Sequence, residues 1–537
     1  MPGFFERLDA LAGTDDAPNS VRWLERVAFV FLVLMVLSAP HSIAATQIAW
    51  LTGMFAWMIS AVVRWRSGSV RAAPRAPRVL NIALWLFFAW SALTSLTSYA
   101  PDISINKLRG VAVFLIFYFV LRNIRNRKAA HFLAIALIVS CMVNVIWTPI
   151  QRLIGRGVEI HGVRPEGPLA KAFLWEGDAL LEANGKKLRE PEDVLRAVEA
   201  NEITRIKFYR PDFEFVVDVR RGDLLSGDDA MSQLGFSSWK KSRNWRSTGF
   251  YGHYTTYAEV LQLILSLVLG LFVAGIGISR RRGEEIAETG DGRAETGDPS
   301  SSPFFFWPAA LLVLGVAAMS LALLLTVTRA SQLAFLISAS VIVLAGLGRK
   351  WLLAAGLVGL PIVIIGLLFL QQSRQVGFFD TKDDSIRWRQ TVWKEGFDLW
   401  TSSPRNFVLG VGMDSVKRFA PEWHMFDNGR LNQGHLHSTP LNLVVERGLP
   451  ALLIWLVVLA AYARSLWKAF KRSTDWLTKV ILLGCLGGMI GFFSSGLVHY
   501  NLGDQEVAMM LFLLMGIGVS LSGRAKSGES IESVGVY

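Results

Sequence analysis

The chain passes from a polar loop into a long apolar run at Gln433-Gly434-His435-Leu436-His437-Ser438-Thr439-Pro440-Leu441-Asn442, which continues through Glu446-Arg447-Gly448-Leu449-Pro450. Ser438 and Thr439 are residue types that favour a helix N-cap, and Pro440 suits a first helical position because its missing N–H would be unpaired there anyway. His437 should therefore lie just outside a helix N-terminus, where free N–H groups and the helix dipole favour an anion. The stretch predicts a histidine base beside an anion site, next to a membrane span.

Composition indicates an integral membrane protein. The chain has 537 residues, 52% of them hydrophobic, and its mean hydropathy is positive. Most of the apolar excess lies in runs of about 18–23 residues, the length that spans roughly 30 Å of bilayer hydrocarbon. The net charge of +12 would also suit a nucleic-acid-binding protein. However, the basic residues are concentrated in short loops between apolar runs, as the positive-inside rule predicts, so no nucleic-acid partner is expected.

The apolar runs predict an all-α polytopic membrane protein of about twelve transmembrane helices with a small α+β extracytoplasmic insertion. The predicted spans lie near 25–41, 44–63, 79–98, 107–121, 129–150, 255–278, 304–327, 331–348, 351–371, 449–463, 477–498 and 505–522. Every second loop is basic, which places both termini in the cytoplasm and the long loops 151–254 and 372–448 outside. The polar N-terminus indicates that the first span is retained rather than cleaved as a signal peptide.

These spans and loops divide the chain into six parts. The parts are membrane helices 1–5 (1–154), the insertion (155–222), membrane helices 6–9 (223–371), an outward loop expected to be catalytic (372–448), membrane helices 10–12 (449–522) and a tail (523–537). The tail has no apolar pattern and is predicted to be disordered. Cys141 and Cys485 both lie inside apolar runs, so neither a disulfide framework nor a cysteine metal site is expected.

The insertion carries signals of a small soluble module. Asn184-Gly185 predicts a tight hairpin turn, 192–199 a short amphipathic helix, and 203–209 and 213–219 two alternating strands. With Gly177-Asp178 ahead of the turn, this order resembles the C-terminal two-thirds of a bacterial PDZ domain.

The PDZ resemblance leaves the role of the module open. The family's carboxylate-binding loop would stand near Ile154–Val158, where the match is poor. Peptide binding by strand addition is one alternative, and a structural or acceptor-docking role is the other. The partner of the module is not predicted.

Basic side chains gather at the outward ends of several predicted spans. Arg246 and His253 precede the sixth span, Arg329 follows the seventh, and Arg387 and Arg389 follow the ninth. A single arginine near a span end is often only an interfacial anchor. Several on one face beside a histidine pair favour a binding site, because guanidinium groups bind phosphate in a forked geometry and stay charged in a poor dielectric. The implied ligand is an anionic lipid head group.

The order of these motifs resembles the O-antigen ligase family, a polytopic group that also includes O-antigen polymerases and oligosaccharide transferases acting on pilin. The matching segments are Arg246…Gly249-Phe250…His253-Tyr254, Thr328-Arg329-Ala330, Arg387–Trp393, Ser403-Pro404…Gly410-Val411-Gly412 and His437-Ser438…Leu441…Glu446-Arg447-Gly448-Leu449. They cover the stretch 240–460, while the twelve-span plan covers the whole chain. The PDZ-like insertion departs from the family's usual plan and leaves the acceptor open.

The resemblance implies transfer of a glycan from undecaprenyl-pyrophosphate to an acceptor hydroxyl on the periplasmic side of a bacterial inner membrane. Because pyrophosphate is already a good leaving group, no nucleotide cofactor is expected, and the sequence shows no nucleotide-binding loop. Arg246 and Arg329 would hold the two phosphates, with Arg389 and Arg387 as further candidates. His437 would accept the proton of the acceptor, kept neutral by nearby cationic charge. Direct attack by the acceptor predicts inversion at the anomeric carbon.

The remaining histidines admit more than one role. His435 could orient His437, serve as a second base, or be a loop residue, and His253 could contact substrate or pack at the interface. His424 and His499 are interpreted as structural residues. A metal at the histidine pair would need further ligands, and since no clustered Asp or Cys supplies them, no metal is expected.

Three functions remain as alternatives. The first is a ligase that attaches a finished glycan to lipid A-core, and the second is a polymerase whose acceptor is another lipid-linked repeat. The third is a non-enzymatic lipid or polysaccharide transporter. A transporter would bury ionisable residues near the bilayer midplane, whereas Glu259 and Glu506 lie close to the ends of their predicted spans.

Overall fold

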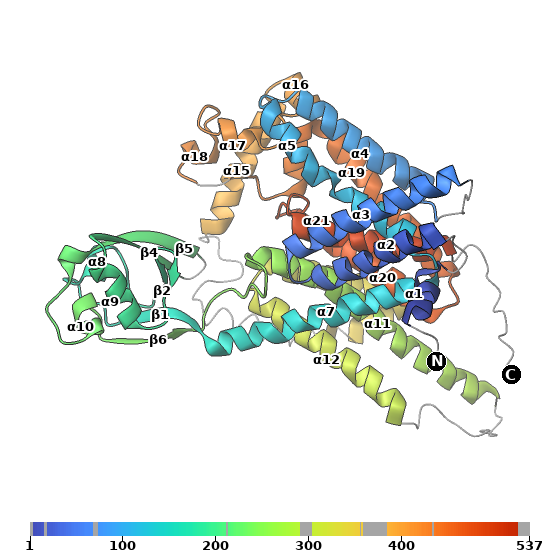
Figure 1. The fold of residues 1–537 in the computed structure, drawn as a ribbon, viewed down its shortest axis with the longest axis horizontal. Coiled ribbons are helices and arrows are strands. Elements are labelled where there is room, and N and C mark those ends of the chain that lie inside the picture. The colour runs from blue at the N-terminus through green and yellow to red at the C-terminus, as the bar shows by residue number, and fades with distance from the viewer. Residues whose placement is uncertain are drawn as a thin grey trace. The chain divides into compact units, whose positions relative to one another are not determined.

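The computed structural model describes residues 4–14, 19–67, 74–210, 213–289, 303–354, 356–357, 384–431 and 434–524. The chain divides into two compact units. Unit 1 comprises Met1–Asn144, Phe250–Leu324 and Thr328–Tyr537, and unit 2 comprises Val145–Gly249 and Leu325–Val327. Figure 1 labels their helices and strands.

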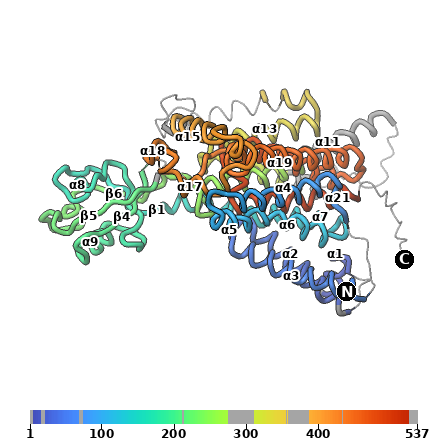
Figure 2. The backbone as a smooth tube through the Cα atoms, turned by 90° about the horizontal axis from the view of Figure 1, so that it is seen from above, coloured from blue at the N-terminus to red at the C-terminus, as the bar shows by residue number. Residues whose placement is uncertain are grey.

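Unit 1 is built from long helices that run roughly along one direction (Figures 1 and 2). The N-terminal helices are α1 (Phe4–Ala12), α2 (Asn19–Ser38), α3 (Ile43–Arg66), α4 (Arg78–Leu96), α5 (Pro101–Val111), α6 (Leu115–Asn123) and α7 (Arg127–Ile154), which runs on into unit 2. The later long helices are α11 (Tyr254–Thr289), α12 (Pro303–Leu325), α13 (Arg329–Gly346), α19 (Thr439–Arg472), α20 (Trp476–Gly496) and α21 (Gln505–Arg524). Between α13 and α19 lie α15 (Asp384–Thr401) and the short elements α16 (Pro404–Leu409), α17 (Ser415–Phe419) and α18 (Met425–Asn428).

Within the described residues, nine helices are long and apolar enough to cross a membrane, which supports a multi-pass membrane protein. They correspond to the second to sixth, eighth and tenth to twelfth predicted spans. The first prediction falls in α2, which is helical but charged near its start, and the seventh falls in α12. The ninth, 351–371, and the tail beyond Arg524 lie largely outside the described residues. The count of twelve therefore stays a prediction.

The centre of unit 1 is formed by α11, α20 and α21. The most apolar stretch of α11 is 94% buried and that of α21 is 89% buried, against 28% for α13. Helices α11 and α20 approach closely at Gly270 and Gly484, where a Cβ on Gly270 would meet the Gly484 Cα at 3.0 Å. Small residues allow such backbone approach between membrane helices. This packing fixes the ends of α11 and α20, which carry part of the site below.

Unit 2 contains one antiparallel sheet. Its strands are β1 (Arg156–His161), β2 (Ala179–Ala183), β3 (Lys186–Lys187), β4 (Ile203–Arg210), β5 (Phe213–Arg220) and β6 (Ser238–Ser242), in the order β5-β4-β2-β1-β6 with β3 pairing β2. Its helices are α8 (Pro168–Lys171), α9 (Pro191–Glu199) and α10 (Ala230–Leu234). A core of Val158, Ile160, Val194, Ile206 and Phe208, with further apolar side chains, fills the module.

The elements predicted in the insertion are confirmed. Asn184 and Gly185 form the two-residue β2–β3 turn with φ of 48° and 80°, the left-handed values that such hairpins require. The helix predicted over 192–199 is α9, and the two predicted strands are β4 and β5. Strands β1 and β6 were not predicted, because neither has a long alternating pattern. The PDZ resemblance itself stays a prediction.

Candidate active site

Helix α19 begins where the sequence predicts. Ser438 is its N-cap, with φ of −154°, and the Ser438 side chain accepts a hydrogen bond from the Leu441 N–H at 3.4 Å. Pro440 lies in the first turn. His437 immediately precedes the cap with φ of 47°, a left-handed conformation that few non-glycine residues adopt. The capped helix start thus holds His437 in an unusual backbone conformation, as is common at functional sites.

The two histidines of the loop face each other. Their ring centroids are 4.0 Å apart, and the His437 backbone N–H donates to His435 Nδ1 at 3.3 Å. Because Nδ1 of His435 accepts this bond, the ring carries its proton on Nε2 in the neutral form. His435 is therefore oriented by the backbone of the residue that it would assist.

Both histidines are held in the neutral form. Burial lowers the pKa of His437 to about 2, and His435, Arg389, His499 and His253 act in the same direction. Burial also lowers the pKa of His435, while the nearby carboxylate of Asp414 opposes that shift. Cationic neighbours contribute as the sequence predicts, but burial is the larger cause.

Helix α15 holds the histidine loop from one side. Trp393 Nε1 donates to the Leu436 carbonyl at 2.9 Å, and the Trp388 ring packs edge-on against His437 with centroids 4.6 Å apart. Arg389 follows on the same helix, with its guanidinium 5.9 Å from the Trp388 ring, and Arg387 is exposed. These contacts bring Arg389 close to the histidine pair.

The loop between α20 and α21 holds the start of α19 from another side. The Thr439 N–H donates to the His499 carbonyl at 2.9 Å, and Thr439 Oγ1 donates to Asn501 Oδ1 at 2.8 Å. The His499 ring pairs with Glu259 of α11, with 2.8 Å between Nδ1 and Oε1. These contacts make His499 part of the site's framework.

Glu446, at the end of the first segment of α19, gathers several polar partners. Its carboxylate accepts the Asp414 N–H at 3.2 Å and the Tyr500 hydroxyl at 3.1 Å. Arg447 lies 3.9 Å away, and both side chains are 6% exposed, so the two form a buried ion pair. Burial raises the pKa of the Tyr500 hydroxyl well above its usual range, which keeps it a donor. Tyr500 also packs against His435, with ring centroids 5.8 Å apart.

A break in helix α19 lies two residues after Glu446, at Gly448. Gly448 has φ of 73° and ψ of 173° inside α19, two residues before Pro450. A Cβ at Gly448 would meet the Val408 carbonyl oxygen at 1.9 Å, and one at Gly410 would meet the Arg447 N at 2.4 Å. Only glycine allows the chain around α16 to approach the break this closely.

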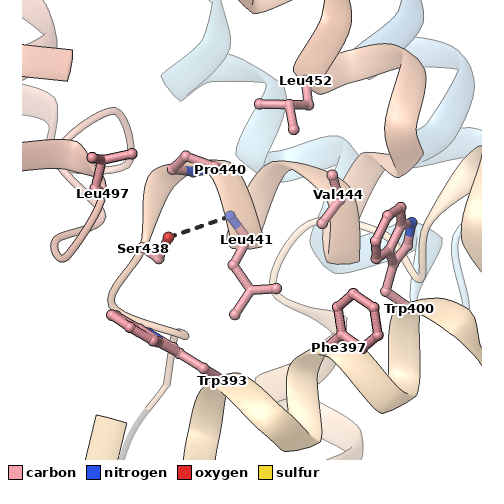
Figure 3. A pocket seen from close by; sticks show the side chains of 9 residues that line it. All are labelled: Trp393, Phe397, Trp400, Ser438, Pro440, Leu441, Val444, Leu452 and Leu497. Carbon is pink, nitrogen blue, oxygen red and sulfur yellow. Dashed lines mark hydrogen bonds between the residues drawn. The ribbon is translucent and has the colours of Figure 1, made fainter. Parts of the chain in front are cut away.

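An apolar cavity of about 360 Å³ opens beside the N-cap. Figure 3 shows Trp393, Phe397 and Trp400 from α15 facing the first turns of α19. The remaining lining residues are Ser438, Pro440, Leu441, Val444, Leu452 and Leu497. Ser438 lines the cavity and follows His437 directly, and Trp393 lines it and bonds the Leu436 carbonyl, so the cavity shares residues with the surroundings of the histidine loop.

The other predicted residues fall in different parts of the chain. His253 is exposed, stacks on Tyr254 and accepts the Thr255 N–H at Nδ1. Arg329 is the first residue of α13 and is half-buried. Arg246 is half-buried in unit 2, next to Trp245, whose indole packs with Ala179, Leu181 and Tyr209. The electrostatic contacts described above join His253 and Arg389 to the histidine pair.

Sequence reasoning missed Asp414 and Tyr500, and it gave His499 only a structural role. The run His499-Tyr500-Asn501 lies between two predicted spans, on the same predicted side as the histidine pair. This position was the one sequence signal that these residues could belong to the site. Among the residues that the structure describes, no group of three or more His, Cys, Asp or Glu side chains is arranged to hold a metal ion.

The comparisons with known proteins agree with the motifs. Residues 314–456 match the family model described as O-Antigen ligase, a stretch that includes Arg329, Arg389, His435 and His437. The comparison with curated proteins found no match. The family match implies O-antigen ligase- or polymerase-type glycosyltransferase activity on lipid-linked glycans in a multi-pass membrane protein. Residues 314–456 are therefore similar to the domain that characterises the O-antigen ligase family.

Proposed function

We propose that this protein is a ligase-type transferase that moves a glycan from undecaprenyl-pyrophosphate to an acceptor hydroxyl, with lipid A-core as the acceptor, on the periplasmic side of the bacterial inner membrane. The observation that supports this best is the half-buried, neutral histidine pair at the capped start of α19, inside the stretch that matches the family. A neutral imidazole can accept a proton, whereas an imidazolium cannot.

In the proposed reaction the acceptor oxygen attacks the anomeric carbon of the glycan. The bond from that carbon to the phosphate oxygen breaks, and the lipid pyrophosphate leaves with the electron pair. His437 accepts the proton of the acceptor hydroxyl. His435 orients His437. One direct displacement inverts the anomeric configuration. The reaction needs no nucleotide or metal cofactor, because the pyrophosphate is an activated leaving group.

The low pKa of His437 has a consequence for this mechanism. A group with a pKa of about 2 is neutral but weakly basic. The charge of Arg389 is one of the causes, and an anionic pyrophosphate bound beside Arg389 would offset it. Binding of the donor would therefore raise the pKa of His437. His437 would thus become a stronger base only when a glycan is present for transfer.

The basic residues would bind the pyrophosphate and glycan of the donor, and the apolar cavity would bind its lipid chain. We assign Arg389, Arg329, Arg246, Arg387 and His253 to the pyrophosphate and adjoining glycan, since guanidinium groups form paired bonds with phosphate oxygens. The cavity walls of Trp393, Phe397 and Trp400 suit the first isoprene units of the carrier.

Reconstitution with a defined undecaprenyl-pyrophosphate glycan tests the proposal. Purified protein is given lipid A-core or a second lipid-linked repeat, and the product is identified by mass spectrometry and its anomeric configuration by NMR. We expect transfer to lipid A-core with inversion. Transfer only to the second repeat would establish the polymerase alternative, and retention would exclude the single displacement.

The arginine assignment is tested by a matched pair. Arg246→Ala should raise the KM for donor about tenfold or more, the loss expected for one charge-assisted phosphate contact. Arg66→Ala, at the last residue of α3, is the control and should leave the KM unchanged. Equal effects of the two changes would mean that Arg246 is only an interfacial anchor.

The proposed topology places both termini in the cytoplasm. A reporter that is active only in the periplasm, fused after Gly185 in the β2–β3 turn, should then be active. The same reporter fused after Arg524 should be silent. The reverse pattern would invert the topology and exclude a periplasmic site.

A further inference from the structure

Helix α15 borders two cavities of different character. Trp393, Phe397 and Trp400 share the face of α15 that borders the apolar cavity (Figure 3). A second cavity, also of about 360 Å³ and called the polar cavity below, is lined by Glu395, Asp398, Leu399, Ser402, Trp423 and Met425. Glu395 follows Trp393 by two positions, which at 3.6 residues per turn is a rotation of about 200° around the helix. The two cavities therefore lie along opposite faces of α15.

Glu395 is fixed by the loop that forms the other wall of the polar cavity. Its two carboxylate oxygens accept the backbone N–H groups of Phe426 and Asp427 at 2.6 and 3.0 Å. Both residues have left-handed backbones, with φ of 59° and 53°, and consecutive N–H groups in such turns bind an anion. Because these bonds already stabilise its charge, Glu395 offers a ligand fixed hydrogen-bond acceptors rather than a bare charge.

Trp423 and Asp398 supply the two other contacts that a ligand could use. The Trp423 ring packs against Tyr99 and Phe419, with centroids 5.4 and 5.1 Å apart, yet it is only half-buried. Asp398 is exposed, and its carboxylate forms no hydrogen bond or ion pair with any residue that the structure describes. The polar cavity thus combines a fixed, accessible aromatic ring with carboxylate oxygens.

The lining selects the chemical class of the ligand. It contains two acids and no basic side chain, so a phosphate group would meet like charge. Carboxylates only accept hydrogen bonds, so the ligand must donate them. Sugar hydroxyl groups do this, and the C–H face of a pyranose ring can pack on the flat indole of Trp423. An ammonium group fits less well, because the charge of Glu395 is already stabilised by two N–H groups.

We propose that the polar cavity binds neutral sugar residues of the acceptor, an inference that rests on the proposed transfer reaction. The proposed donor occupies the other face of α15, with its lipid in the apolar cavity and its pyrophosphate beside Arg389. The polar cavity is therefore left for the second substrate. Met425 of its wall packs in one apolar cluster with Leu436, the residue between the two histidines. An acceptor sugar in this cavity is thus bound next to elements that hold the proposed base.

Saturation-transfer NMR of the full-length protein tests the site without donor or acceptor lipid. The probes are two neutral hexose trisaccharides, maltotriose and galactotriose, and the detergent has no sugar head group. We expect binding, with a Kd that rises about tenfold in Trp423→Ala and in Asp398→Asn, the losses expected for a ring contact and for a hydrogen bond to a charged group. Trp175→Ala and Glu422→Gln are the matched controls, since both residues are exposed and neither lines the cavity. They should leave the Kd unchanged.

Three binding results would overturn the proposal. The first is that neither trisaccharide binds. The second is equal saccharide binding by the wild-type protein, Trp423→Ala and Asp398→Asn, which would place the sugar elsewhere. The third is binding of ethanolamine but of neither trisaccharide, which would make the cavity an amine site.

The transfer assay separates the two substrates. Asp398→Asn should raise the KM for the acceptor about tenfold and leave the KM for the donor unchanged. The opposite result would assign the cavity to the donor glycan and overturn the proposal. Saccharide binding by a wild-type protein that transfers no glycan would refute the transfer reaction but not the sugar site, so the two failures are distinguishable.

Discussion

The sheet module of unit 2 and the histidine site of unit 1 are stabilised in different ways. The module has an apolar core, and its one deeply buried carboxylate, Asp178, is fully matched by a two-pronged contact from Arg210 and by the Trp175 N–H. The histidine site instead has a half-buried His437 in a left-handed conformation, and two buried carboxylates nearby, with Glu446 bonded to Tyr500 and Glu259 to His499. Unit 2 follows local folding rules, whereas the histidine site departs from them, as is expected of a site with a functional role.

The largest expected effect lies on the site side of this comparison. His437→Ala should lower transfer about 100- to 10,000-fold, the contribution typical of a general base. The protein should still reach the membrane and elute as one species, since the N-cap and the Thr439 contacts remain. Turnover with saturating donor is the measurement. His424→Ala, an exposed histidine of the same loop, is the control; similar losses in both variants would remove His437 from the mechanism.

Two glycines allow the same substitution to be compared in both regions. Gly448→Ala should cost well over 2 kcal/mol, because a left-handed φ alone costs about 1–2 kcal/mol and the new Cβ would collide with the Val408 carbonyl. We expect poor folding and a greater than tenfold loss of transfer. Gly185→Ala has a similar φ but no atom within 4 Å of the new Cβ, so it should cost about 1 kcal/mol and leave transfer unchanged. Thermal unfolding midpoints in detergent measure both.

If the two glycine variants lost equal stability, the close approach at the helix break would carry no special cost. The break would then be an ordinary kink, and the contrast between the two regions would weaken.

The smallest expected effect is a flat pH profile. In the proposed mechanism His437 acts in its neutral form, and because its pKa is lowered, that form persists as the pH falls. The kcat/KM for donor, which reports the free enzyme, should stay constant from pH 7 to pH 5. A histidine with an ordinary pKa of about 6.5 would lose about tenfold by pH 5.5. Such a loss would show that the free protein does not bury His437 as described.

The elements that the sequence predicts correctly are those set by neighbouring residues. Asn184-Gly185 specifies its own turn, and Ser438 specifies its own helix start. The apolar runs specify most of the spans because their length alone matches the bilayer. The O-antigen ligase resemblance was also accessible, since its motifs are short segments in a fixed order.

The polar network of the site was not accessible in the same way. Tyr500 meets Glu446, and His499 meets Glu259, across 54 and 240 residues of sequence, respectively. Neither pair leaves a periodic pattern, because each depends on how α11, α19 and the α20–α21 loop pack. β6 was missed for a related reason. Its five residues form a strand only because they pair with β1, which is distant in the sequence.

The contact between Thr439 and the α20–α21 loop would couple the proposed reaction to the bilayer. Helices α20 and α21 are both long and apolar enough to span a membrane. Their connecting loop accepts hydrogen bonds from the backbone N–H and from the hydroxyl of Thr439, the first residue of α19. A hairpin that tilts to match a thinner or thicker membrane would pull on that first turn, and thus on the adjacent base. If His437 is the base, acyl-chain length would change the rate of the proposed reaction, so the surrounding lipid would act as a mechanical regulator as well as a solvent.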